Sequence, residues 1–207
     1  MEVTHDRLQF SSLYTTRFAA SFGYMTVLTL LPTYIDALGA TGLTIGLFIT
    51  ALEVARTVGI VPLGWAGDRY SKGTVLVVAL VVSALAYFVF AGVTTVDGFL
   101  AARVLQGLGL TGTGLLSLAL VGELAPDDSR ANRIGRYNGF RMAAGIAGTL
   151  GAGLLYALTG FTVLFGLLTV LLVVAAVSVW AFVDGDETSV EGFAFTDLAL
   201  NRRIVTL

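Results

Sequence analysis

Residues 74–94 read TVLVVALVVSALAYFVFAGVT, a run of 21 residues without one charged side chain. A helix rises ~1.5 Å per residue, so this run is long enough to cross a hydrocarbon layer of ~30 Å. Valine and phenylalanine favour strands in water, but lipid offers no partner to an exposed backbone, so a run of this length is expected to be helical. Its residues also lack the polar–apolar alternation of a transmembrane barrel strand.

Five further stretches share this character, and together the six cover 131 of the 207 residues. The whole chain is 56% hydrophobic and only 13% charged, about half the charged share of a usual soluble domain. The sequence therefore predicts an all-α membrane protein with six transmembrane helices. We place the spans at residues 18–38, 43–63, 74–94, 99–121, 137–158 and 161–183.

The connections between these spans alternate in charge. The three short connections hold no Lys or Arg. Nine of the twelve basic residues lie in the other set of segments, which are 1–17, 64–73, 122–136 and 184–207. By the positive-inside rule both termini are expected on the cytoplasmic side of the cell membrane. We expect residues 1–183 to form a transmembrane bundle and residues 184–207 a cytoplasmic tail or a linker to a further half.

The composition also excludes several classes of site. The chain has no cysteine, and its single histidine, His5, precedes the first span. Thiolate or histidine metal centres and a Ser–His pair at membrane depth therefore have no basis, and we expect no enzyme activity, metal or cofactor. No ATP-binding glycine-rich loop is present, so the use of ATP is not expected. A basic cluster with interleaved aromatic residues is also absent, so nucleic-acid partners are not expected.

Three stretches near the spans form recognisable motifs. Residues 64–73 read GWAGDRYSKG, residues 103–107 read RVLQG and residues 123–130 read ELAPDDSR. Their sequences and their places on a six-span plan resemble the signature motifs of the major facilitator superfamily. In the first motif, the matching positions are Gly64, Asp68, Arg69 and Lys72.

This resemblance implies a fold and a function. Each half of that fold consists of two inverted three-helix repeats, so this chain would supply the amino-terminal half. The implied activity is secondary active transport of small solutes across the cytoplasmic membrane by alternating access. The expected partners are the lipid bilayer, a small-molecule solute with a coupling proton as an option, and a second six-helix half from a longer chain or a homodimer copy. The alternative is a non-transporting scaffold or sensor, or an isolated half that needs a partner chain.

The resemblance also assigns a gating motif to the cytoplasmic face. Gly64, Asp68, Arg69 and Lys72 would form it together with Glu123. In the family the residue that matches Asp68 engages the start of a helix in the opposite half. A carboxylate near a helix N-terminus would favour the state that is closed to the cytoplasm.

Five charged or polar residues within the spans are candidates for a cavity or a coupling site. Glu53 and Arg56 share one helical face at i, i+3 spacing, and Arg141 should reach a similar depth from the opposite end of its span. Charges at such depth need partners, which predicts a Glu53–Arg56–Arg141 cluster. An ion pair that braces the helices and a substrate or proton site both remain open. For Arg103 and Gln106 the resemblance suggests a cavity or coupling role, while snorkelling or backbone hydrogen bonds are the alternatives for the arginine.

Glycines in the fourth and fifth spans predict close helix packing. Small residues allow two helix backbones to approach each other. In the fifth span, residues 139, 143, 147 and 151 are all Gly or Ala and form a stripe at i+4 spacing. The glycines assigned to packing are Gly107, Gly139, Gly145, Gly148 and Gly151.

Overall fold

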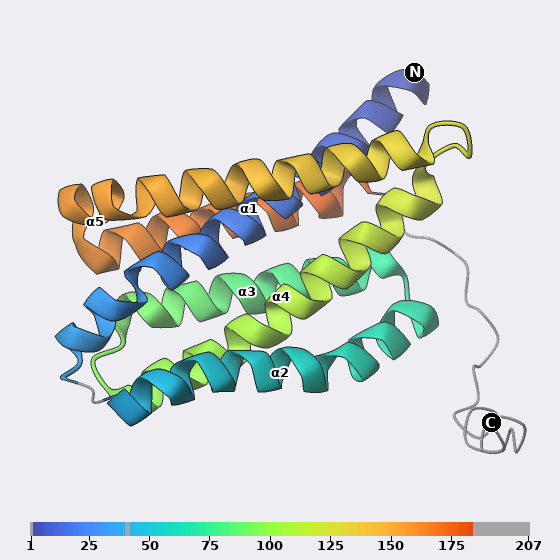
Figure 1. Ribbon diagram of the computed structural model, residues 1–207. Helices are drawn as coiled ribbons and strands as arrows, with labels where there is room; N and C mark the ends of the chain where they lie inside the picture. The colour runs from blue at the N-terminus through green and yellow to red at the C-terminus, as the bar shows by residue number, and fades with distance from the viewer. Residues whose placement is uncertain (1, 40–41, 184–207) are drawn as a thin grey trace, which may run out of the picture.

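The computed structural model describes residues 2–39 and 42–183, and this part of the chain is all-helical (Figure 1). The elements are α1 (Glu2–Ala37), α2 (Gly42–Arg69), α3 (Lys72–Gly92), α4 (Val96–Leu124) and α5 (Arg130–Phe182). All five are long and apolar enough to cross a membrane. The predicted all-α membrane fold is thus confirmed. The tail or linker predicted for residues 184–207 lies outside the described residues.

The helix α5 reverses its direction at Gly160. This residue has φ 70° and ψ 177°, a conformation that is open only to glycine because a Cβ would clash with the backbone. Figure 1 shows the arm before this residue (130–159) and the arm after it (161–182) running in opposite directions. The two spans predicted in this region therefore fall on two arms of one element, joined by a single residue.

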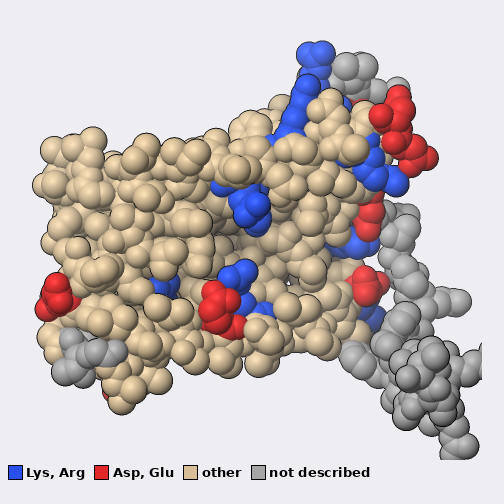
Figure 2. All heavy atoms as spheres, viewed as in Figure 1, with Lys and Arg blue, Asp and Glu red and all other residues tan. Residues whose placement is uncertain are grey.

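The helices extend further at the charged end of the bundle than hydropathy predicts. We expected the first span to begin at Phe18, but α1 begins at Glu2. Similarly, α2 continues to Arg69, and α5 already begins at Arg130. Charged residues interrupt a hydropathy window but not a helix, whose hydrogen bonds join backbone groups. Figure 2 shows Lys, Arg, Asp and Glu gathered at this end.

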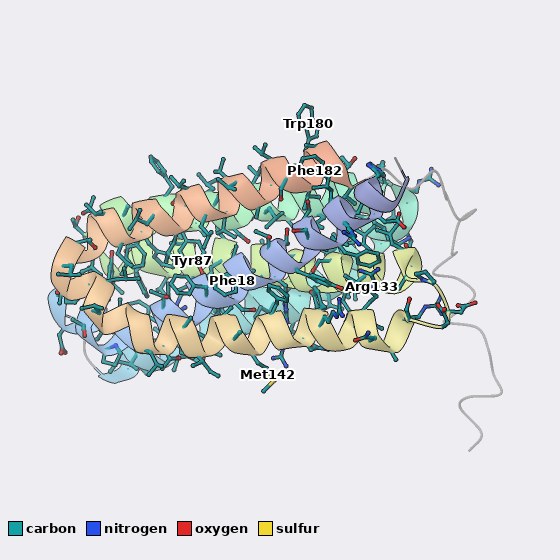
Figure 3. The ribbon with its side chains drawn as sticks, turned by 90° about the horizontal axis from the view of Figure 1, so that it is seen from above. Phe18, Tyr87, Arg133, Met142, Trp180 and Phe182 are labelled. Carbon is teal, nitrogen blue, oxygen red and sulfur yellow. The ribbon has the colours of Figure 1, made fainter. Side chains whose placement is uncertain are left out.

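The packing places α1 between the two arms of α5. Figure 3 shows α1 crossing between them, and α1 makes its most extensive contacts with α5. The helix α3 packs on both α4 and α5, whereas α2 packs mainly on α4.

Side chains that cap the helices help to set their starts. Ser71 accepts a hydrogen bond from the backbone N–H of Thr74 at 3.4 Å, and Thr95 accepts one from that of Gly98 at 3.2 Å.

An aromatic cluster joins four of these segments at the end opposite the charges. The Tyr34 hydroxyl of α1 donates to the carbonyl oxygens of Phe90 (2.9 Å) and Val93 (3.0 Å), where α3 ends. Terminal carbonyls of a helix have no partner within it, so the single proton of this hydroxyl is shared between two otherwise free acceptors. The Tyr34 ring also lies 4.7 Å from that of Phe99 in α4 and 5.6 Å from that of Phe165 in the second arm of α5.

Two glycines mark close approaches between helices. A Cβ at Gly107 of α4 would lie 2.6 Å from the Leu52 carbonyl oxygen of α2. At Gly148 of α5, a Cβ would lie 2.7 Å from the Phe22 carbonyl oxygen of α1. Only a missing side chain permits backbones to pack at these distances.

At the other predicted packing glycines, a Cβ would have room. A Cβ at Gly145 would make an ordinary contact of 3.7 Å with Met25 of α1. Around Gly139 nothing lies within 4 Å, and the nearest atom to Gly151 belongs to Leu155 of the same helix. The stripe predicted from 139 to 151 therefore does not lie in a helix contact of the described chain. Its i+4 spacing defines a face, but spacing alone does not say which neighbour that face meets.

Candidate functional site

A cavity of about 600 Å³ lies between α1, α2, α4 and the first arm of α5. Volumes of 300–1,000 Å³ are usual for small-molecule sites. Three arginines line it, and they come from three different helices: Arg17 of α1, Arg56 of α2 and Arg141 of α5. An adjoining groove of about 320 Å³ shares Arg17 and Arg56 and adds Glu53. The charged residues of the two hollows therefore form one continuous surface.

These charges lie far from the ends of their helices. Arg56 is 14 residues after Gly42 and 13 before Arg69, the ends of α2, or roughly 20 Å from each. Arg141 lies 11 residues after the start of α5 and 19 before Gly160. Figure 2 likewise shows a group of basic and acidic side chains midway along the bundle, apart from the charged end.

The structure joins part of the predicted Glu53–Arg56–Arg141 cluster. One terminal nitrogen of Arg56 lies 2.9 and 3.1 Å from the two carboxylate oxygens of Glu53. Both side chains are nearly half exposed, at 44% and 49%. Arg141 lines the same cavity as Arg56, but it forms no ion pair with any carboxylate in the described part of the chain.

Arg17 is a member of this site that the sequence interpretation missed. Its guanidinium carbon lies 5.3 Å from the ring centre of Tyr137 on α5, and its Nε is buried without a hydrogen-bond partner among the described residues. The Tyr137 hydroxyl is in turn 2.6 Å from Ser117 Oγ on α4. Because we began the first span at Phe18, Arg17 was assigned to the cytoplasmic segment. Its i, i+4, i+7 spacing with Ser21 and Tyr24, which also line the cavity, was the available signal.

The residues of the predicted gating motif lie at the charged end of the bundle. Lys72 Nζ is 3.1 Å from Glu123 Oε1, so this pair joins the start of α3 to the end of α4. Asp68 and Arg69 are exposed in the last turn of α2, and neither forms an ion pair within residues 2–39 and 42–183. Gly64 faces Leu115 of α4, whose Cδ2 is 3.8 Å from the position of a Cβ. We expected residues 64–73 to form a loop, but only Tyr70 and Ser71 lie between the two helices.

A family model of the Major Facilitator Superfamily matches residues 13–201. The chain belongs to the Major Facilitator Superfamily. This confirms the resemblance inferred from the three motifs.

Two further comparisons show proteins to which the chain is similar. An uncharacterized MFS-type transporter of Methanocaldococcus jannaschii is 28% identical over 127 residues, which cover 61% of this chain and 32% of the archaeal protein. The crystal structure of a mutant of the peptide transporter POT in complex with sulfate superposes with a TM-score of 0.72 at 20% identity. That match covers 83% of this chain and 37% of the other. The chain thus matches about a third of the length of each protein, and the structural likeness shows a shared fold.

The superfamily motif RVLQG lies inside the bundle and away from the cavity. Arg103 and Gln106 are 1% and 0% exposed, and neither lines the cavity. Arg103 donates to the Gln106 side-chain oxygen at 2.9 Å, and the Gln106 amide nitrogen donates to the Tyr87 hydroxyl of α3 at 2.9 Å. This chain of hydrogen bonds braces α4 against α3. A role for Arg103 and Gln106 in coupling stays a prediction.

Metal binding finds no support in the geometry. Within the part of the chain that the structure describes, no group of three or more His, Cys, Asp or Glu side chains could hold a metal ion. The candidate site is a cavity lined by arginines together with hydroxyl-bearing and apolar side chains.

Proposed function

We propose that this chain is the amino-terminal half of a secondary active transporter, which moves small solutes across the cytoplasmic membrane by alternating access. In this proposal α1 to α4 and the two arms of α5 make six crossings, arranged as two inverted three-helix repeats. Both termini face the cytoplasm, as the distribution of basic residues predicts. The observation that carries the proposal is the cavity, because it brings charges from three helices together midway along an apolar bundle.

A second half is part of this proposal. Arg56, Arg141 and Glu53 have exposed side chains at a depth where contact with lipid would be costly. A second six-helix wall would enclose them and complete the passage. Either a longer chain or a second copy in a homodimer would supply it. The superfamily relatives support the first arrangement, since this chain matches about a third of their length.

Single-cysteine labelling tests alternating access without knowledge of the solute. The chain has no cysteine, so each introduced thiol is unique within it, and any cysteine of the second half would first be replaced by serine. We would express Thr149→Cys, which lies on the cavity wall, from the complete reading frame in membrane vesicles of both orientations. A membrane-impermeant maleimide should reach this thiol from either side. Leu164→Cys is the matched control, because Leu164 is fully buried and its thiol should stay unlabelled.

Two further thiols test the orientation. Arg69→Cys should react only from the cytoplasmic side and Thr159→Cys only from the outside. Labelling of both on one side would contradict the proposed topology. If the thiol at residue 149 reacts from one side alone under every gradient, the protein is a scaffold or a sensor instead of a carrier.

A further inference from the structure

The cavity carries more positive than negative charge. Three arginines line the cavity and its adjoining groove, against one carboxylate, that of Glu53. Glu53 is already paired with Arg56. Arg17 and Arg141 form no ion pair with any carboxylate of residues 2–39 and 42–183. Two of the three positive charges therefore lack a counter-charge from the described chain.

These arginines cannot relieve the imbalance by losing a proton. A guanidinium stays charged in proteins, whereas an uncompensated charge at membrane depth is costly. Arg17, Arg56 and Arg141 line the same cavity, so their like charges repel one another. A site of this kind is stabilised by an anion that contacts several arginines at once. Guanidinium groups suit this purpose because they bind carboxylate and phosphate oxygens in pairs.

The surroundings of Arg17 hold it in position for such a contact. Its guanidinium lies over the Tyr137 ring, whose hydroxyl is fixed by Ser117. The side chain thereby spans from α1 towards α4 and α5 before any ligand arrives. Preorganised cations lose less entropy on binding than freely moving ones do.

The rest of the cavity wall is mainly apolar. Hydroxyl groups come from Ser21, Tyr24 and Thr149, next to the arginines. The apolar share comes from Met25, Leu110, Met142, Ile146 and Leu150. Methionine adapts its shape to irregular ligands. Such a wall fits a solute that has an apolar body as well as a charged group, and it offers little to a bare inorganic ion.

We infer that Arg17, Arg56 and Arg141 bind an organic anion, with its carboxylate or phosphate among the guanidinium groups and its apolar body against the methionine and leucine side chains. The inference takes from the proposed function only that the solute enters this cavity. Binding is measurable without transport, so the two ideas fail separately.

The experiment is a binding titration of the full-length protein in nanodiscs of phosphatidylcholine. The probes are 1-naphthoate, 1-naphthyl phosphate, the neutral isostere 1-naphthamide and inorganic phosphate. We expect one or both organic anions to bind, and the amide and inorganic phosphate to bind at least about tenfold more weakly, as for hydrogen bonds to charged groups. Equal affinity for naphthoate, naphthyl phosphate and naphthamide, or no binding of either organic anion, would overturn the inference.

Substitutions assign the binding to these arginines. Arg141→Gln removes a charge from an exposed side chain, so folding should persist, and the Kd for the bound anion should rise roughly tenfold to a hundredfold. Arg141→Lys keeps the charge, so it should raise the Kd for the anion less than Arg141→Gln does. The matched control is Arg136→Gln, an exposed arginine of the same arm that does not line the cavity. Unchanged binding in Arg141→Gln and in Arg17→Gln refutes the site.

Two other sources of negative charge are separated by further arms of the titration. A second half could supply carboxylates to Arg17 and Arg141, and then no organic anion would bind, which overturns the inference. A lipid headgroup could supply the anion, and then adding phosphatidylglycerol to the nanodiscs would abolish naphthoate binding, which also overturns it. If the thiol at residue 149 is labelled from both sides but no organic anion binds, the proposed transport stands and only this inference is wrong.

Discussion

Replacing Gly107 by alanine should separate α2 from α4. The new Cβ would lie 2.6 Å from the Leu52 carbonyl oxygen, 2.9 Å from the Ala55 Cβ and 3.3 Å from the Arg56 nitrogen. Ordinary contact begins at 3.4 Å, so the α2 backbone must withdraw by about 0.8 Å, the difference between 3.4 and 2.6 Å. The first and last of these atoms belong to the backbone and have no rotamer by which to move aside.

The expected cost follows from two opposing terms. Overpacking of this kind destabilises by about 1–3 kcal/mol. Replacing a helical glycine by alanine restores about 0.5–1 kcal/mol of backbone entropy. Gly107→Ala should therefore lower the free energy of unfolding by up to about 2.5 kcal/mol, and it should lie about 1–3 kcal/mol below a Gly→Ala change at a helical site without the clash. It should also disturb the cavity, because the displaced segment of α2 carries Arg56.

The assay is reversible unfolding in mixed detergent micelles with increasing dodecyl sulfate, followed by the fluorescence of Trp65 and Trp180. Gly139→Ala is the matched control, since nothing lies within 4 Å of a Cβ there. The free energy of unfolding of Gly139→Ala should equal that of the parent protein or exceed it by up to about 1 kcal/mol. If Gly107→Ala proves as stable as Gly139→Ala, the inferred close approach of α2 and α4 is wrong.

Three further substitutions test other parts of the structure. Tyr34→Phe removes the hydroxyl that serves the end of α3 and should cost about 1–3 kcal/mol in the same assay, whereas Tyr24→Phe should cost little, because the Tyr24 hydroxyl forms no hydrogen bond with the residues that the structure describes. Gly160→Ala forces a side chain into a backbone conformation reserved for glycine and should cost about 1–3 kcal/mol, whereas the unstrained helical control Gly153→Ala should match or slightly exceed the parent's stability. Asp68→Asn should slow transport of the solute by the full-length protein while membrane insertion stays normal, and undiminished transport would contradict the gating role.

The sequence predicts the helices well because the constraint is simple. An uncharged run such as residues 74–94 must pair its backbone internally in lipid, and helix α3 covers most of that run. The ends are harder to predict, since a helix can continue past the lipid into water. Nothing in residues 2–17 or 64–69 breaks a helix, and hydropathy does not distinguish a polar helical turn from a loop.

The same limit explains why Arg17 was missed. A charge next to an apolar run marks the end of a span by hydropathy, but a helix that begins 15 residues earlier carries Arg17 into the bundle. Conversely, two of the charges that hydropathy places within spans, Arg56 and Arg141, line the cavity. Arg103 shows the remaining difficulty, because α4 has neighbours on several faces. Only the packing determines that Arg103 turns towards Gln106 and Tyr87 instead of the cavity.

The single-residue joint at Gly160 restricts how the bundle can move. With no linker between them, neither arm of α5 can slide along its axis without pulling the other. Because α1 crosses between these arms, the three segments should travel as one rigid body. Arg17 and Arg141 lie on that body, and their mutual spacing should stay constant when the bundle changes conformation. The helix α2, packed mainly on α4, has more freedom to bring Arg56 nearer to them or to carry it away.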